Sequence, residues 1–122
     1  MSVPAILNLE KLLDTPRDGA LLRFSLGNEY LKLLQFDKAS VYFQQALEKD
    51  PNYSAAWKEL GQALQSSGKL QQALETWQRG AVVAEQRGDK QAAKVMAVFA
   101  KRLQKQIGTT DADIEGLPPA PP

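Results

Sequence analysis

The chain contains neither cysteine nor histidine among its 122 residues. Their absence excludes thiol nucleophiles, disulfides, the usual zinc ligand sets and every Ser-His or Cys-His pair for covalent catalysis. The carboxylates Glu29, Asp37, Glu59 and Glu75 also lack the paired spacing typical of metal or catalytic sites. We therefore expect no enzyme activity, no cofactor and no metal.

Long apolar runs are also missing: no stretch approaches the roughly 20 residues of a membrane span. The N-terminus, Met1 to Pro4, has no basic region followed by an apolar segment. The chain has 15 basic and 14 acidic side chains, a formal net charge of only +1. At this length a single domain with one core is expected. These features predict a soluble cytoplasmic protein that does not contact membranes.

The small net charge conceals an uneven distribution. Residues 87–107 carry six basic side chains against Asp89 alone, whereas residues 108–122 carry three acidic side chains and no basic one. The sequence therefore predicts a basic last helix next to an acidic tail.

The chain does contain a repeat with a period of 34 residues. Leu26-Gly27 returns as Leu60-Gly61, Ala39 returns as Ala73, and Phe43 returns as Trp77. Self-similarity at this fixed spacing indicates stacked helical hairpins, each too small to bury its apolar face without a neighbour.

Capping and stop signals divide the chain into six predicted helices. Thr15-Pro16-Arg17-Asp18 has the form of a capping box, so a helix is expected to begin near Pro16 or Asp18 and to run to about Leu34. Pro51, Gly68 and Gly88 are expected to end later helices. The other predicted helices are 3–14, 36–49, 54–67, 70–87 and 89–107. Residues 108–122 are acidic and proline-rich and are predicted to be disordered.

The repeated residues resemble the tetratricopeptide repeat, whose pattern is Trp-x2-Leu-Gly-x2-Tyr followed by Ala-x3-Phe, Ala and Pro. Residues 20–53 match at Leu26, Gly27, Tyr30, Ala39, Phe43, Ala46 and Pro51. Residues 54–87 match at Trp57, Leu60, Gly61 and Ala73, with Trp77 in place of Phe. The departures are Arg23 at the Trp position of the first repeat, and Leu64, Gly80 and Glu85 at the Tyr, Ala and Pro positions of the second.

The resemblance implies an all-α fold of antiparallel hairpins, stacked as a short right-handed superhelix within a single domain of residues 1–107. Helices 3–14 and 89–107 are expected to cap its two ends. Gly27 and Gly61 are expected to let the two helices of each hairpin approach closely, together with Ala39 and Ala73. Phe43, Trp57 and Trp77 are expected to fill the space between hairpins.

In tetratricopeptide proteins the leading helices line a concave groove that holds a peptide of a partner. The corresponding positions here are Leu21, Phe24, Asn28, Leu31 and Lys32 in the first repeat, and Ala55, Lys58, Gln62 and Gln65 in the second. We expect a small bacterial-type adaptor in which Asn28 and Gln62 pair with the peptide backbone. Alternatively, Leu21, Phe24 and Leu31 pack against the N-terminal helix, and the groove is smaller and more polar.

Some members of the family hold the acidic C-termini of heat-shock chaperones with asparagines and basic residues. Asn28 matches one such position, but Phe24 stands where the first lysine is expected. The sequence therefore favours a mixed apolar and polar peptide over such a chaperone tail.

A second hypothesis rests on the last predicted helix. Lys90, Lys94, Lys101 and Lys105 lie at spacings of four, seven and four, which places them along one helix face. This face is either an ordinary solvated surface or a site for nucleic acid or an acidic protein. Nucleic acid is disfavoured because no aromatic residue lies among the lysines to stack on a base. The oligomeric state is predicted to be a monomer or a weak dimer.

Overall fold

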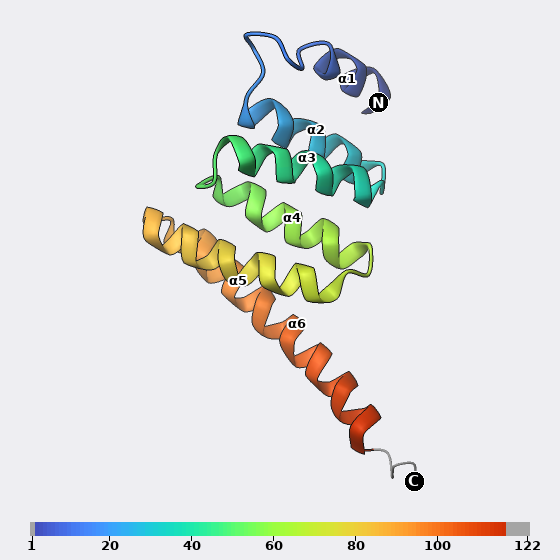
Figure 1. The fold of residues 1–122 in the computed structure, drawn as a ribbon, viewed down its shortest axis with the longest axis vertical. Helices are drawn as coiled ribbons and strands as arrows, with labels where there is room; N and C mark the ends of the chain where they lie inside the picture. The colour runs from blue at the N-terminus through green and yellow to red at the C-terminus, as the bar shows by residue number, and fades with distance from the viewer. Residues whose placement is uncertain (1, 117–122) are drawn as a thin grey trace.

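The computed structural model describes residues 2–116, which form six helices and no strand (Figure 1). The helices are α1 (Ser2–Glu10), α2 (Ala20–Lys32), α3 (Phe36–Lys49), α4 (Ser54–Ser66), α5 (Leu70–Arg87) and α6 (Lys90–Gly116). They stack in chain order from α1 to α6, and the C-terminal part of α6 projects beyond the other helices (Figure 1). The predicted all-α fold of stacked hairpins is confirmed.

The ends of the helices agree with the sequence except at three places, the end of α1, the start of α2 and the end of α6; α1 ends at Glu10 and not at residue 14. The trailing helices α3 and α5 have the predicted bounds. Helix α6 instead continues to Gly116, so the boundary predicted after Ile107 falls within a helix. Gly108 does not stop it, because one glycine inside a helix costs only about 1 kcal/mol. The remainder of the predicted tail, residues 117–122, lies outside the residues that the structure describes.

Three helices end in the same left-handed turn. Leu34, Gly68 and Gly88 follow α2, α4 and α5 with φ of 60°, 84° and 88°. The N–H of each following residue bonds back into the helix, as in Asp89 N to Ala84 O at 2.8 Å. These bonds satisfy carbonyls that the helix end leaves free. The two glycine stops are confirmed, and α2 ends near Leu34 as predicted, but the left-handed turn at Leu34 was not predicted, because leucine rarely adopts positive φ.

The glycines of the repeat permit close approach within each hairpin. A Cβ atom built on Gly27 meets the ring of Phe43 at 2.5 Å, and one on Gly61 overlaps the indole of Trp77. Gly80 is a departure from the family pattern, and its missing side chain leaves room for Trp57 and Met96. The glycine and aromatic positions are therefore matched in pairs across the helices.

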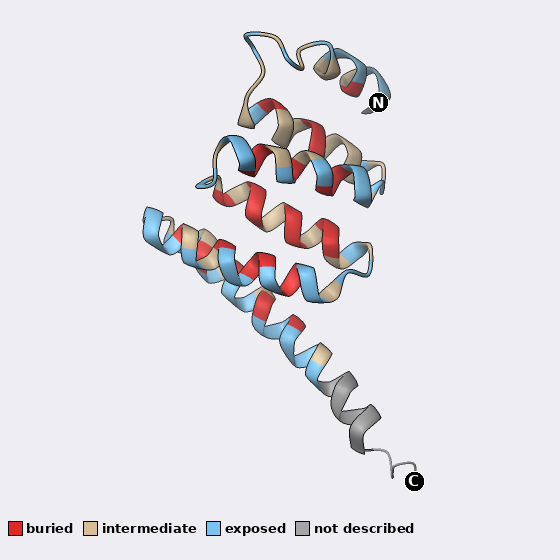
Figure 2. Ribbon diagram, in the orientation of Figure 1, coloured by how far each residue is buried: buried red, intermediate tan, exposed pale blue. Residues whose placement is uncertain are grey.

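Two clusters of buried side chains form the interior. Figure 2 marks where buried residues lie along the helices. The main core runs from α3 to α6, and its large members with almost no exposure include Phe43, Trp77, Met96 and Leu103. A smaller cluster at the N-terminal end joins Ile6 of α1 to Leu22 and Leu26 of α2. Helix α1 thus covers one end of the stack, as predicted for a cap.

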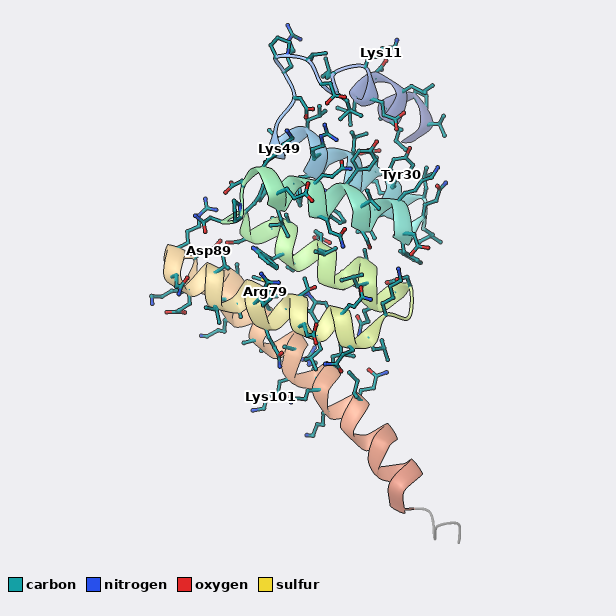
Figure 3. The ribbon with its side chains drawn as sticks, viewed as in Figure 1. Lys11, Tyr30, Lys49, Arg79, Asp89 and Lys101 are labelled. Atoms are coloured by element: carbon teal, nitrogen blue, oxygen red, sulfur yellow. The ribbon has the colours of Figure 1, made fainter. Side chains whose placement is uncertain are left out.

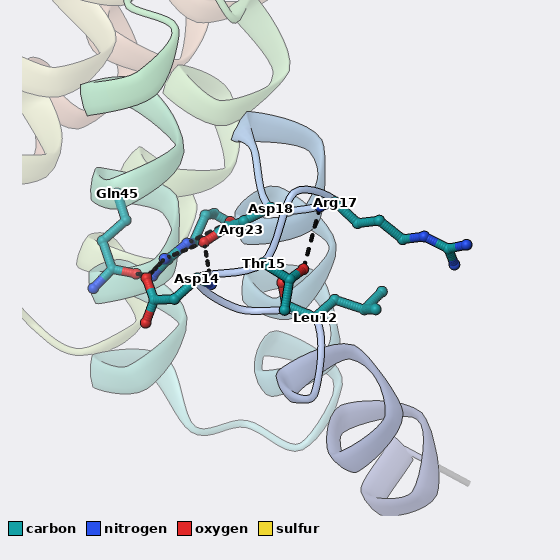
Figure 4. A network of polar contacts seen from close by, with 7 residues as sticks. All are labelled: Leu12, Asp14, Thr15, Arg17, Asp18, Arg23 and Gln45. Atoms are coloured by element: carbon teal, nitrogen blue, oxygen red, sulfur yellow. Dashed lines mark hydrogen bonds and ion pairs between the residues drawn. The ribbon is translucent and has the colours of Figure 1, made fainter.

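The connection between α1 and α2 does not form the predicted capping box. The N–H of Asp18 donates to the carbonyl of Thr15 at 2.9 Å, not to its hydroxyl, and Gly19 occupies the N-cap position without a side-chain bond. The carboxylate of Asp18 binds Arg23 instead, at 3.0 Å to Nε and 2.6 Å to Nη2 (Figure 4). Helix α2 therefore begins at Ala20, later than the sequence predicted.

Arg23 stands at the position of the tryptophan in the family pattern. Its side chain links the α1–α2 connection to the first hairpin. Besides Asp18, it donates to Gln45 of α3 at 2.8 Å and approaches Asp14 at 3.4 Å (Figure 4). The hydrogen bonds from Arg23 hold the pKa of the Asp18 carboxyl well below its usual range. In the second repeat, Trp57 and Arg79 stand at the positions of Arg23 and Gln45, with the guanidinium 5.4 Å from the indole centroid.

Helix α1 is also held by polar contacts. The Glu10 carboxylate accepts hydrogen bonds from Tyr30 at 3.0 Å and Tyr42 at 3.3 Å, whose rings stack with centroids 5.6 Å apart. Burial raises the pKa of both phenols, and the neighbouring Glu10 charge raises it further. Both tyrosines therefore remain neutral donors to α1.

Candidate functional site

The leading helices α2 and α4 enclose a shallow depression of about 310 Å³. It is lined by Ser25, Asn28, Glu29, Leu31 and Lys32 of α2 and by Glu59 of α4. Asn28, Leu31 and Lys32 are among the groove positions predicted from the sequence. All three are placed by α2, whose opposite side buries Leu22 and Leu26 against α1.

Two carboxylates give this depression its charge, and each lies near a lysine. Lys32 Nζ lies 3.1 Å from Glu29 Oε2, and Lys58 Nζ lies 3.9 Å from Glu59 Oε2. The other oxygen of Glu29 is buried, with no hydrogen-bond partner among the described residues. Asn28 adds an amide that can both donate to and accept from a peptide backbone. The depression therefore offers two carboxylates and one lysine, with Lys58 beside it, and two neutral polar side chains, Ser25 and Asn28.

The predicted apolar residues of the groove have different surroundings. The ring of Phe24 packs at a tilt against Tyr53 and Phe43, with centroids 4.8 and 5.7 Å away, so Phe24 belongs to the edge of the main core. Leu31 packs against the same core, while the side chain of Leu21 is 69% exposed. The alternative in which these residues pack against the N-terminal helix is therefore wrong.

The predicted residues on α4 lie next to the depression rather than in it. Lys58, Gln62 and Gln65 are half-buried and follow one face of α4. Sequence reasoning missed Ser25, Glu29 and Glu59. Ser25 and Glu59 stand 34 residues apart, at equivalent repeat positions, and this was the available signal.

The lysines of the alternative surface lie along exposed positions of α6. Lys90 binds Glu85 of α5 at 3.0 Å. Lys94, Lys101 and Lys105 are exposed, and none has an ion pair within the described part of the chain. Figure 3 shows Lys101 extending outward from α6.

Two further kinds of feature bear on function in the part of the chain that the structure describes: clusters of metal ligands and membrane-spanning helices. Among the described residues, no three carboxylate, histidine or cysteine side chains group as metal ligands. Within the same part of the chain, no helix is both long and apolar enough to cross a membrane.

Paired helices with glycine–aromatic contacts, stacked one pair on the next, define the class of helical-repeat proteins. A family model of the tetratricopeptide repeat matches residues 24–93, and the chain belongs to that family. Proteins of this family generally mediate protein–protein interactions and are generally non-catalytic scaffolds.

Individual relatives agree with this assignment. The chain is 45% identical over 100 residues to the TPR repeat-containing protein PA0015 of Pseudomonas aeruginosa, covering 82% of this chain and 95% of that protein. The solution structure of protein BPP2914 from Bordetella parapertussis aligns with a TM-score of 0.72 and 42% identity, covering 83% of this chain and 88% of that one. A tetratricopeptide repeat domain protein from Salinibacter ruber has the same fold, with a TM-score of 0.68 at 23% identity over 75% of this chain and 92% of that one.

Proposed function

We propose that this protein is a non-catalytic binding module that holds a peptide segment of a partner against α2 and α4. The observation that supports this proposal is the depression lined by Asn28, Lys32 and Glu59, which lies between the two leading helices of the repeats. Its amide and its charges are suited to a peptide that carries polar groups.

Five of the predicted groove residues have a role in this proposal. Asn28 and Gln62 hydrogen-bond the peptide backbone, since each amide offers a donor and an acceptor. The exposed Leu21 supplies an apolar contact for an anchor side chain. Lys32 and Lys58 interact with carboxylates of the peptide, and their present partners Glu29 and Glu59 interact with its basic groups.

A selected peptide tests the proposal. Random peptides displayed on phage would be selected on the full chain, and the best binder would be titrated into wild type and Asn28→Ala. We expect at least a tenfold loss of affinity, about 1.4 kcal/mol. The free energy of unfolding should stay within about 0.5 kcal/mol of wild type, as is usual for such a substitution outside the core.

Gln78→Ala provides the matched control, because this exposed amide lies on the trailing helix α5. It should bind the peptide as wild type does. A loss of stability in Asn28→Ala comparable to that of a core substitution would show that Asn28 is structural. Equal peptide affinity in both variants would place the binding site elsewhere.

A further inference from the structure

Helix α6 has the internal plan of a leading helix. The seventh residue of α2, α4 and α6 is a buried apolar side chain, and the eighth is small: these are Leu26-Gly27, Leu60-Gly61 and Met96-Ala97. In the first two hairpins the small residue lies against an aromatic ring of the trailing helix. Ala97 is thus placed to receive such a ring.

No helix of the described chain covers Ala97, which is exposed. A depression of about 580 Å³ lies there, between the C-terminal half of α5 and the N-terminal half of α6. Its apolar lining comes from Ala81 and Val82 of α5 and from Ala93 and Ala97 of α6, and Val82 is 55% exposed. This is the position that a trailing helix of a third hairpin would occupy.

The charges around this depression indicate what it binds. Lys90 and Lys94 line it, and Lys101 lies seven residues beyond Lys94 on the same face. Residues 90–108 contain five basic and no acidic side chains. Lys90 has Glu85 as a partner, whereas Lys94 and Lys101 have no ion pair among the described residues. An acidic ligand therefore complements this surface.

We propose that the depression between α5 and α6 binds an acidic amphipathic helix of a partner protein, which packs as a third trailing helix and places an aromatic side chain on Ala97. The observed trailing helices show the pattern: an alanine precedes the aromatic by four residues in Ala39–Phe43 and in Ala73–Trp77. A nucleic acid backbone would meet the lysines but leave Val82 and Ala97 uncovered. The site is separate from the groove between α2 and α4, so failure of either leaves the other intact.

The probe is a synthetic, end-capped peptide with the sequence of α5 in which Arg79→Glu and Arg87→Glu make it acidic. It would be titrated into the full-length ¹⁵N-labelled protein. We expect saturable binding, with the largest amide shifts at Val82, Ala93 and Ala97. The same peptide carrying Trp77→Ala should bind at least tenfold more weakly, because the ring that covers Ala97 is gone.

Protein variants separate the apolar and the electrostatic contributions. Ala97→Gln fills the depression at an exposed helical position and should weaken the peptide at least tenfold. Lys94→Glu combined with Lys101→Glu should do the same, whereas Lys11→Glu combined with Lys49→Glu has the same net charge and should bind within twofold of wild type. Lys11 and Lys49 lie away from α6 (Figure 3). Circular dichroism would verify that each variant is folded.

Four results would overturn the proposal. One is the absence of saturable binding up to about 1 mM peptide, a level at which even contacts worth roughly 4 kcal/mol are detected. The second is equal affinity for wild type and Ala97→Gln. The third is a single-stranded oligonucleotide that binds through Lys94 and Lys101 while the peptide does not. The fourth is self-association of the wild type that Ala97→Gln abolishes, which would assign the depression to a second copy of this chain.

Discussion

At the scale of single residues, glycine and its aromatic partner set the distance between helices. Gly27 and Phe43 form one such pair, and Gly61 and Trp77 form the other. The 34-residue period predicted both members of each pair as structural residues but placed the aromatic rings between hairpins, whereas the structure places each ring against the glycine of its own hairpin.

Gly27→Ala should destabilise the protein although alanine is the better helix former. The added methyl overlaps the Phe43 ring, and overpacking of this kind costs about 1–3 kcal/mol. Urea unfolding measures the change. Gly108→Ala is the matched control, because nothing lies within 4 Å of that position in α6, and it should stabilise by about 0.5–1 kcal/mol. Stabilisation by both substitutions would contradict the close packing at Gly27.

Leu34→Gly should stabilise the protein. Leu34 has φ of 60° and is 71% exposed, so its side chain contributes little burial while its backbone is strained. Its repeat equivalent, Gly68, makes the same turn without a side chain. We expect a gain of about 1 kcal/mol in the free energy of unfolding. Thermal and urea unfolding test this, and the reverse change, Gly68→Leu, should be destabilising.

At the scale of elements, the departures from the family pattern decide how the N-terminal segment attaches. Arg23 replaces a tryptophan and binds Asp18, so the α1–α2 connection lies against the first hairpin. In the second repeat Trp57 keeps the aromatic contact, with Gly80 providing the space. The two hairpins therefore have the same backbone plan with different neighbours.

The Asp18–Arg23 pair should make the free energy of unfolding depend on pH in the acidic range. Because the pKa of Asp18 is lowered in the folded state, its contribution is fully present above the unfolded value of about 3.9 and is lost as the pH falls below it. As the pH falls below about 4, the free energy of unfolding should therefore decrease more steeply for wild type than for Asp18→Asn. Thermal unfolding across this range measures the difference.

Asp37→Asn is the control for this experiment. The side chain of Asp37 is 78% exposed and lies 3.7 Å from Lys69. Its removal should change stability little, since exposed ion pairs contribute about 0–1 kcal/mol. Equal acid dependence in wild type and Asp18→Asn would show that the Arg23 contact does not stabilise the fold.

At the scale of the whole molecule, stability is distributed unevenly along the stack. The main core joins seventeen buried residues from α3 to α6, whereas the N-terminal cluster joins Ile6, Leu22 and Leu26. Each layer of a repeat array is stabilised mainly by its immediate neighbours. Helix α1 has a neighbour on one side only.

Hydrogen exchange should therefore show α1 opening before the centre of the array. The free energy of opening measured at the amides of α1 should be lower than that measured at the amides of α4, because α4 is packed between α3 and α5. Exchange followed by NMR gives both values in one experiment. Ile6→Ala should accelerate exchange in α1 and leave the α4 amides protected. Identical protection in α1 and α4 would instead indicate that the whole chain opens as one unit.

The sequence by itself determined the hairpins through its 34-residue period, and the ends of α3 and α5 through Pro51 and Gly88. These features follow from local geometry, because spacing along a helix fixes which side chains share a face. Asn28 and Lys32 were proposed as groove positions from the family resemblance, by their place in the repeat. The tertiary structure alone decided that Phe24 joins the core edge, that Glu29 and Glu59 share a depression, and that Arg23 binds Asp18. These contacts join side chains of different segments and depend on how successive helices are oriented in the stack. Residue spacing does not determine that orientation.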